Sequence, residues 1–296
     1  MLSWAAAASG SGSRIVDVRP LHGDDGPWLL RIERVGSVDA AVLKGGPPSP
    51  RVGPFMIATG AAALQAAERH GLAAPRLIAA DLDGGHTGAV TTLETVVPGS
   101  TAWPITASAD RLRAAGAALA AVHAIPMEPT EHLPSGHARS PWTTSLAIGE
   151  GRMPTTRLLE DADRLITARG RPAGPSGFVH GDVWPGNIIW TNDDQPVLID
   201  WKTAGVGAPG VDLGELRKQV AIIFGPQAPD LVLEGWEHAA GTTAQDVAYW
   251  DAVAALNTPT QLDDGYLLDG WAQLDGAAAS GRRDAFLEIA LARIDN

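Results

Sequence analysis

Residues 178–201, FVHGDVWPGNIIWTNDDQPVLIDW, are the stretch from which the rest of the chain can be interpreted. Two apolar runs in it, Ile188–Trp190 and Val197–Ile199, are joined by a polar turn, and this pattern predicts a β-hairpin. Asn187 then lies at the entry of the first strand and Asp200 at the exit of the second. Because those two ends of an antiparallel hairpin are neighbours, we expect one metal ion to contact both side chains.

Three polar residues in this stretch are of the types that phosphoryl transfer needs. A carboxylate such as Asp182, placed beside a substrate hydroxyl, can accept its proton as the phosphoryl group moves. The amide oxygen of Asn187 and the carboxylate of Asp200 are hard donors that suit Mg²⁺. An Asp, an Asn five residues later and a second Asp after the next strand favour binding of a nucleoside triphosphate and its metal. The alternative is a set of turn residues without chemistry.

The run from His180 to Asn187, followed by Asp200-Trp-Lys-Thr-Ala, resembles two motifs of the aminoglycoside phosphotransferase and choline kinase family, H-G-D-x-x-x-x-N and D-[W/F]-x-x-[A/S]. The family is related to the protein kinases. The resemblance implies an α+β, bilobal protein-kinase-like fold, with a small antiparallel-sheet lobe over residues 1–98 and a larger, mostly helical lobe over 99–296. It also implies that Asp182 is the catalytic base and that Asn187 and Asp200 bind Mg²⁺.

The first lobe is predicted from strand and turn patterns to be a five-stranded antiparallel sheet with one helix. The expected strands are 14–19, 28–35, 39–44, 76–80 and 87–95, and the expected helix is 55–70. The resemblance implies that a first turn with Gly23 and Gly26 covers the ATP phosphates and that Lys44 pairs with the α- and β-phosphates. It further implies that the backbone from Glu94 to Val96 binds adenine. A simple tight turn and a solvated lysine are the alternatives.

The helix of this lobe departs from the family pattern. Kinases place a glutamate there to pair with the strand lysine, but the matching position is Gly60, and the helix has one acid, Glu68, eight residues later. Three explanations stay open: Glu68 pairs with Lys44 after a shift in alignment, another group holds Lys44, or the lysine matters less here. Near the second motif, Lys202 replaces a common acid, and Ala208 stands where the family often has Asp.

The second lobe is predicted to be mostly helical. The expected helices are 107–125, 155–169, 212–224, 228–240, 243–256, 261–278 and 281–293. We interpret His123 as a packed histidine and expect Asp212 to cap the helix after it and to brace the catalytic loop by hydrogen bonds. The family builds its acceptor pocket in the last third, which here contains Trp236, Trp250, Trp271, Glu237, Asp251, Asp263, Asp264 and Asp269. Core tryptophans and solvated helix faces are the alternative.

Composition limits the class of protein. The 296 residues are 45% hydrophobic, enough for a large core, and the absence of cysteine excludes disulfides and thiol chemistry. Residues 1–98 have a net charge of −1 and residues 99–296 of −11. That acidity disfavours nucleic acid and favours a cationic substrate, with ordinary solubility as the alternative. The chain shows neither a signal peptide nor a run of about 18 apolar residues, so we expect a cytoplasmic protein that does not contact the membrane.

The function predicted from these patterns is transfer of the γ-phosphoryl group of ATP, or alternatively GTP, with Mg²⁺, to a hydroxyl of a small molecule such as an aminoglycoside or a related antibiotic. One alternative is a metabolic kinase for a sugar, an amino sugar, choline or a fructosamine. Another is a nucleotide-binding pseudokinase, which the missing helix glutamate and the incomplete glycine loop would explain.

Overall fold

The computed structural model describes residues 1–21, 26–45, 53–103, 108–135, 156–258 and 275–294. The chain divides into two compact units. The first consists of Met1–Pro98 together with two short later segments, Thr130–Leu133 and Ile199–Ala204. The second comprises Gly99–Pro129, Pro134–Leu198 and Gly205–Asn296. Asp200 therefore belongs structurally to the first unit, although its motif is contiguous in sequence with the second.

The first unit is built on a five-stranded antiparallel sheet, as predicted. Its strands are β1 (Arg14–Pro20), β2 (Trp28–Arg34), β3 (Ser37–Gly45), β4 (Leu77–Asp81) and β5 (Thr91–Thr95), in the order β1-β2-β3-β5-β4. The last strand begins four residues later than expected. Thr87 is held in the preceding turn because its backbone N–H and its hydroxyl donate to the carboxylate of Asp81, at 2.7 and 2.8 Å.

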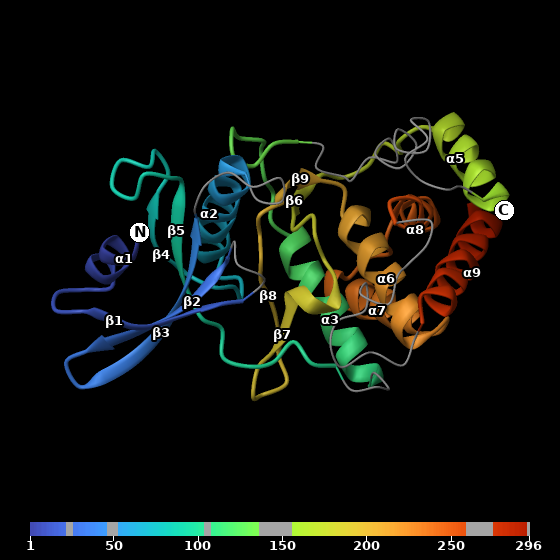
Figure 1. The fold of residues 1–296 in the computed structure, drawn as a ribbon. Helices are drawn as coiled ribbons and strands as arrows, with labels where there is room; N and C mark the ends of the chain where they lie inside the picture. The colour runs from blue at the N-terminus through green and yellow to red at the C-terminus, as the bar shows by residue number, and fades with distance from the viewer. Residues whose placement is uncertain (22–25, 46–52, 104–107, 136–155, 259–274, 295–296) are drawn as a thin grey trace. The chain divides into compact units, whose positions relative to one another are not determined.

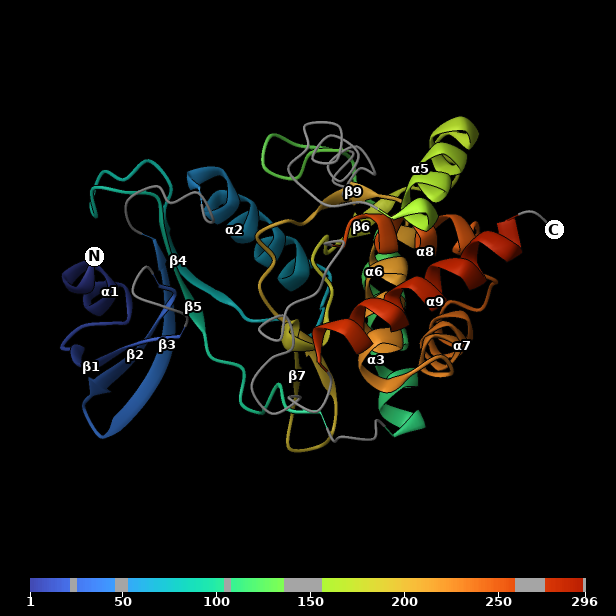
Figure 2. The same cartoon turned by 45° about the vertical axis from the view of Figure 1, so that its right-hand side comes forward.

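Two helices lie on opposite sides of this sheet (Figures 1 and 2). The predicted one is α2 (Pro54–Arg69), which begins at a proline and is followed by Gly71 with a left-handed φ of +69°. The other, α1 (Leu2–Ala8), was not predicted. Its Ala5 packs against alternate residues of the strands, which are Leu30, Ile32, Ala41, Leu43 and Leu93. The residues that alternate with these along the strands face the other side of the sheet.

The second unit contains helices and two small sheets. Its helices are α3 (Ala109–His123), α5 (Arg157–Arg169), α6 (Gly210–Phe224), α7 (Ala228–Ala240), α8 (Val247–Leu256) and α9 (Gly276–Ile294). The predicted hairpin is present as β7 (Ile188–Trp190) and β8 (Pro196–Leu198), with Ile188 paired to Leu198. A one-turn 3₁₀ helix, η1 (Pro185–Asn187), precedes it. The strand β6 (Gly177–Val179) pairs with β9 (Gly205–Gly207), which the sequence did not predict.

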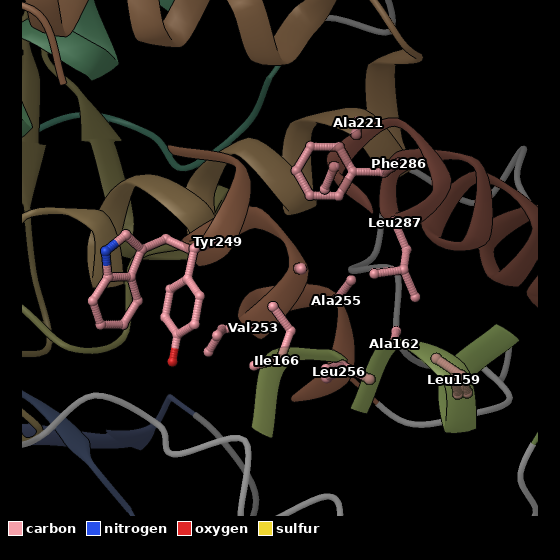
Figure 3. Packing of buried hydrophobic residues seen from close by; sticks show 13 residues of the cluster. Leu159, Ala162, Ile166, Ala221, Tyr249, Val253, Ala255, Leu256, Phe286 and Leu287 are labelled. Carbon is pink, nitrogen blue, oxygen red and sulfur yellow. The ribbon is translucent and has the colours of Figure 1, made fainter. Parts of the chain in front are cut away.

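A hydrophobic cluster joins α5, α6, α8 and α9 (Figure 3). The members that Figure 3 labels are Leu159, Ala162, Ile166, Ala221, Tyr249, Val253, Ala255, Leu256, Phe286 and Leu287. Here α9 corrects the sequence prediction, because one continuous helix from Gly276 runs through the expected break at 279–280. Ala279 at that point is fully buried, so packing favours helix over a turn at Ser280-Gly281. Most of the predicted helix 261–278, with Trp271, Asp263, Asp264 and Asp269, lies outside the described residues.

The helices α3 and α7 are in close backbone contact. A Cβ added to Gly116 would lie 2.0 Å from the carbonyl oxygen of Val232, and one added to Gly235 would lie 2.0 Å from the carbonyl oxygen of Arg113. Each helix therefore uses a glycine to bring its backbone against the other. This contact fixes the end of α3 relative to α7. No helix among the described residues is long and apolar enough to cross a membrane.

Candidate active site

The loop His180–Asn187, which is the predicted catalytic loop, places Asp182 and Asn187 side by side in the second unit. The Nδ2 of Asn187 donates to the backbone oxygen of Asp182 at 2.8 Å and lies 3.5 Å from its carboxylate Oδ2. The turn η1 makes this approach possible, because Asn187 N–H also donates to the carbonyl of Trp184. Asn187 is 6% exposed, so its amide holds the loop closed while Asp182 stays half-buried. A bound metal ion would take the opposite amide atom, Oδ1.

The side chain of Asp212 holds this loop in place through hydrogen bonds to its backbone. Its two carboxylate oxygens accept hydrogen bonds from the backbone N–H groups of His180 and Gly181, both at 2.8 Å. The residue is completely buried. Burial would raise the pKa of Asp212, but the hydrogen bonds from His123 and the backbone of His180 outweigh burial and hold that pKa below its ordinary value. The predicted bracing is therefore present. The predicted capping is wrong, because Asp212 lies within the first turn of α6 and its oxygens are turned to the loop.

His123, expected to be a packed histidine, connects this brace to two helices. Its Nε2 is 3.0 Å from Asp212 Oδ2, and its Nδ1 accepts a hydrogen bond from Trp236 Nε1 at 2.9 Å. Since Nδ1 is the acceptor, Nε2 carries the proton that goes to Asp212. His123 at the end of α3 and Trp236 in α7 thus hold the carboxylate that holds the predicted catalytic loop.

In the first unit, Lys44 lies between two carboxylates. Its Nζ is 3.1 Å from Glu94 Oε2 and 3.4 Å from Asp200 Oδ1. Burial lowers the pKa of a lysine, but the two carboxylates outweigh it, and the pKa of Lys44 is raised above its ordinary value. The ammonium group is therefore a permanent positive charge at neutral pH. Asp200 lies in the segment Ile199–Ala204, which is part of this unit.

Asp200 has a strained backbone and a second cationic neighbour. Its φ is +63°, in the left-handed region that few non-glycine residues adopt. Lys202 Nζ contacts its Oδ2, on the side of the carboxylate away from Lys44. Such strain is often found where a side chain must point in one direction for function. The lysine that stands in place of the usual acid thus contacts the predicted metal ligand.

The side-chain contacts of Glu94 were missed by sequence reasoning, which used only its backbone. No pattern within Thr91–Thr95 could have predicted these contacts, because they depend on the register of β5 against β3. Val96, which follows β5, is 37% exposed. In the predicted phosphate loop, Gly26 has a φ of +84° and precedes β2, while Gly23 lies outside the described residues. The adenine and phosphate roles of these backbones stay predictions.

Several residues expected near the acceptor have structural partners. Trp236 donates to His123, and Asp251 forms a buried ion pair with Arg217 at 2.9 Å. Glu237 accepts a hydrogen bond from the backbone of Ala244 at 3.0 Å. Trp236 is thus a core tryptophan, whereas Asp251 is buried and does not lie on a solvated helix face. An acceptor role for these residues stays a prediction. A small recess beside the catalytic loop is lined by Gly181, Val211, Glu215, Trp250, Val253, Ala254 and Asn257.

The oxygen donors of Asp200 and Asn187 fit a hard divalent cation that completes its coordination shell with phosphate oxygens and water. Across the described ranges, no cluster of three or more His, Asp or Glu side chains is arranged to enclose a metal ion. Mg²⁺ normally uses one or two protein oxygens and completes its shell with phosphate oxygens and water. The carboxylate of Asp200 and the amide of Asn187 are of that kind. They belong to different units, so their sharing of one ion stays a prediction.

The comparisons with known proteins agree with this fold. The model of the phosphotransferase enzyme family, APH, matches residues 8–256. No curated protein matches. Similar solved structures include macrolide 2'-phosphotransferase MphH from Brachybacterium faecium, with 19% identity over 97% of this chain and 98% of that one and a TM-score of 0.58.

Two further structures share the fold. Choline kinase LicA from Streptococcus pneumoniae has 14% identity over 95% of this chain and 94% of that one, with a TM-score of 0.58. Amicoumacin kinase hAmiN, in complex with AMP-PNP, Ca²⁺ and Ami, has 11% identity over 92% and 88%, with a TM-score of 0.60. Since the family model covers most of the sequence, this chain belongs to the phosphotransferase enzyme family and is a small-molecule kinase with a protein-kinase-like fold.

Proposed function

We propose that the protein transfers the γ-phosphoryl group of ATP to a hydroxyl group of a small molecule and requires Mg²⁺. The observation that carries this proposal is the catalytic loop, in which two backbone N–H groups are fixed on Asp212 and an amide is fixed on Asp182. A carboxylate on so constrained a loop suits a base that must meet one hydroxyl in one orientation.

In this mechanism, Asp182 orients the acceptor hydroxyl and takes its proton while the oxygen forms a bond to the γ-phosphorus. The bond from that phosphorus to the β,γ-bridging oxygen breaks, and ADP is the leaving group. Lys44 neutralises charge on the nucleotide phosphates. Asn187 and Asp200 are the residues that would hold Mg²⁺, which supplies further charge neutralisation to the phosphates. Residues 1–98 would form the nucleotide-binding lobe and 99–296 the lobe for catalysis and the acceptor.

The acceptor class is the second part of the proposal. An antibiotic such as an aminoglycoside is favoured by the net charge of −11 over residues 99–296, which would attract a cation. Among the structural relatives, amicoumacin kinase hAmiN was solved with AMP-PNP and Ca²⁺, and MphH is a macrolide 2'-phosphotransferase. Choline kinase LicA represents the metabolic alternative. A cytoplasmic location stays a prediction.

The experiment measures ADP release by the purified protein with Mg-ATP or Mg-GTP. The acceptor panel contains aminoglycosides, macrolides, amino sugars, choline and fructosamines, and the variant Asp182→Asn serves as the blank. We expect one acceptor class to give turnover that the variant lacks. An antibiotic acceptor should also raise the inhibitory concentration when the protein is expressed in a sensitive host. Nucleotide binding without ADP release on any acceptor would favour the pseudokinase, and no nucleotide binding would overturn the proposal.

A further inference from the structure

The acid that contacts Lys44 lies on a neighbouring strand of the same sheet. Glu94 Oε2 is 3.1 Å from Lys44 Nζ, and only 4% of the Glu94 side chain is exposed. Its other oxygen, Oε1, is 3.3 Å from the hydroxyl of Thr92, which donates to it. Both carboxylate oxygens therefore have a defined partner, and the side chain is held in one orientation.

Strand register brings the pair together. In the antiparallel pairing of β3 with β5, Lys44 lies opposite Thr92 and Val42 lies opposite Glu94. Lys44 and Glu94 are thus diagonal neighbours on one face of the sheet, within reach of two long side chains. The intervening residues Leu43 and Leu93 point to the other face, into the core with α1. A slip of one residue would bury the charges in that core, so the pair is as fixed as the register.

The helix α2 contributes no acid to this pair. Gly60 is buried on α2, and a Cβ there would lie 3.9 Å from the backbone of Lys202. Glu68 is exposed near the end of the helix. Within the described part of the chain, the ion pairs of Lys44 go to Glu94 and Asp200. This geometry selects, among the three explanations left open by the sequence, the one in which another group holds the lysine.

Building on the proposed function, we propose that Glu94 is the positioning residue that holds Lys44 for the nucleotide phosphates, in the role that a helix glutamate has in protein kinases. An ammonium group has three N–H donors. Among the described residues, two of them face Glu94 and Asp200, and the third is the one we assign to a phosphate oxygen. Because both partners of the Lys44–Glu94 pair are in the sheet, the lysine is ready for nucleotide whatever the position of α2.

The test is a double-mutant cycle on nucleotide binding, which needs no knowledge of the acceptor. The full-length protein and the variants Glu94→Gln, Lys44→Met and the double variant are titrated with AMP-PNP and Mg²⁺ in a calorimeter. Glutamine keeps the shape and the bond to Thr92 but removes the charge. We expect Kd to rise about tenfold or more in each single variant. The double variant should bind within about twofold of Lys44→Met, because Glu94 acts through the lysine. Glu68→Gln, a surface acid on α2, is the control and should bind normally.

Two further variants separate positioning from a structural role. Glu94→Asp keeps the charge on a shorter side chain and should recover part of the lost affinity. Thr92→Val removes only the hydrogen bond that orients Glu94 and should raise Kd by about threefold, with a thermal unfolding midpoint close to that of the wild type. The second variant keeps the test valid if Glu94→Gln destabilises the sheet.

The outcomes distinguish this inference from the proposed function. Wild-type affinity in both Glu94→Gln and Thr92→Val, or a full additional loss from Glu94→Gln in the Lys44→Met background, overturns the positioning role. Tight nucleotide binding with the expected cycle but no ADP release on any acceptor would refute the kinase activity alone. A wild-type protein that binds no nucleotide would overturn both.

Discussion

The catalytic loop and the Lys44 cluster are held by different forces. Asp182 is positioned through neutral backbone N–H groups that converge on Asp212, a carboxylate with no exposed surface. Lys44 and Asp200 are positioned by charges, and their side chains are 19% and 30% exposed. Hydrogen-bond geometry in a dry site tolerates little change, whereas partly exposed charges adjust and are screened by salt. The proposed base is thus fixed, and the groups proposed to meet the phosphates and the metal remain adjustable.

The largest effect should come from the base itself. Asp182→Asn removes the proton acceptor but keeps the size of the side chain, so kcat should fall by about 10²- to 10⁴-fold while nucleotide affinity stays nearly unchanged. ADP release with the best acceptor and an AMP-PNP titration measure the two quantities. Equal turnover in this variant would show that another group takes the proton and that the fixed loop has a different purpose.

The next largest effect is expected from Asp212, whose carboxylate holds the loop that contains Asp182. Asp212→Asn presents an NH₂ group to one of the backbone donors, so a buried N–H loses its acceptor. The free energy of unfolding should fall by about 1–3 kcal/mol for each group left unpaired, and kcat should fall at least about tenfold. Urea denaturation and steady-state kinetics measure both. Asp110→Asn is the control, because that carboxylate is 98% exposed on α3.

The stability difference between the wild type and Asp212→Asn should depend on pH. The pKa of Asp212 is lower in the folded chain than in the unfolded chain, where the group has its ordinary value near 3.8. Its contribution to stability is therefore complete above pH 4 and is lost as the pH falls through the lower, folded pKa. The stability gap between wild type and Asp212→Asn should narrow in acid, measured by urea denaturation at pH 7 and pH 3. An equal stability difference at both pH values would show that the charge of the Asp212 carboxylate does not stabilise the fold.

The smallest effect is expected at the contact between Lys202 and Asp200. Lys202 contacts the carboxylate of Asp200, so a divalent cation at Asp200 must share that carboxylate with the ammonium group. Lys202→Met should lower the Mg²⁺ concentration for half-maximal AMP-PNP binding by about two- to fivefold, the size expected of a partly exposed pair. Lys202→Arg keeps the charge and should behave like the wild type. An unchanged Mg²⁺ dependence in Lys202→Met would mean that the two cations do not compete.

The two regions also differ in how well the sequence predicts them. The hairpin follows from neighbouring residues, because local spacing determines which residues of a short turn can pair. The bracing by Asp212 joins residues about thirty positions apart and was predicted from the family motif, not from local spacing. The Lys44–Glu94 contact depends on the register of strands fifty residues apart, which no spacing within one segment reveals. Short elements such as α1 and β9 are stabilised by tertiary packing and leave little local pattern. The incomplete glycine turn around Gly23 lies outside the described residues, so that prediction stands as it was made.

The glycine contact between α3 and α7 has a consequence for mutational tolerance. Gly116 and Gly235 touch the opposite backbone and have no part in the chemistry. A single methyl group at either position would force the helices apart, and these helices carry His123 and Trp236, which support Asp212. A screen of random variants for lost activity should therefore recover alanine at these two glycines alongside changes in the catalytic loop. The activity is therefore sensitive to substitution at two positions that have no side chain and lie outside the proposed active site.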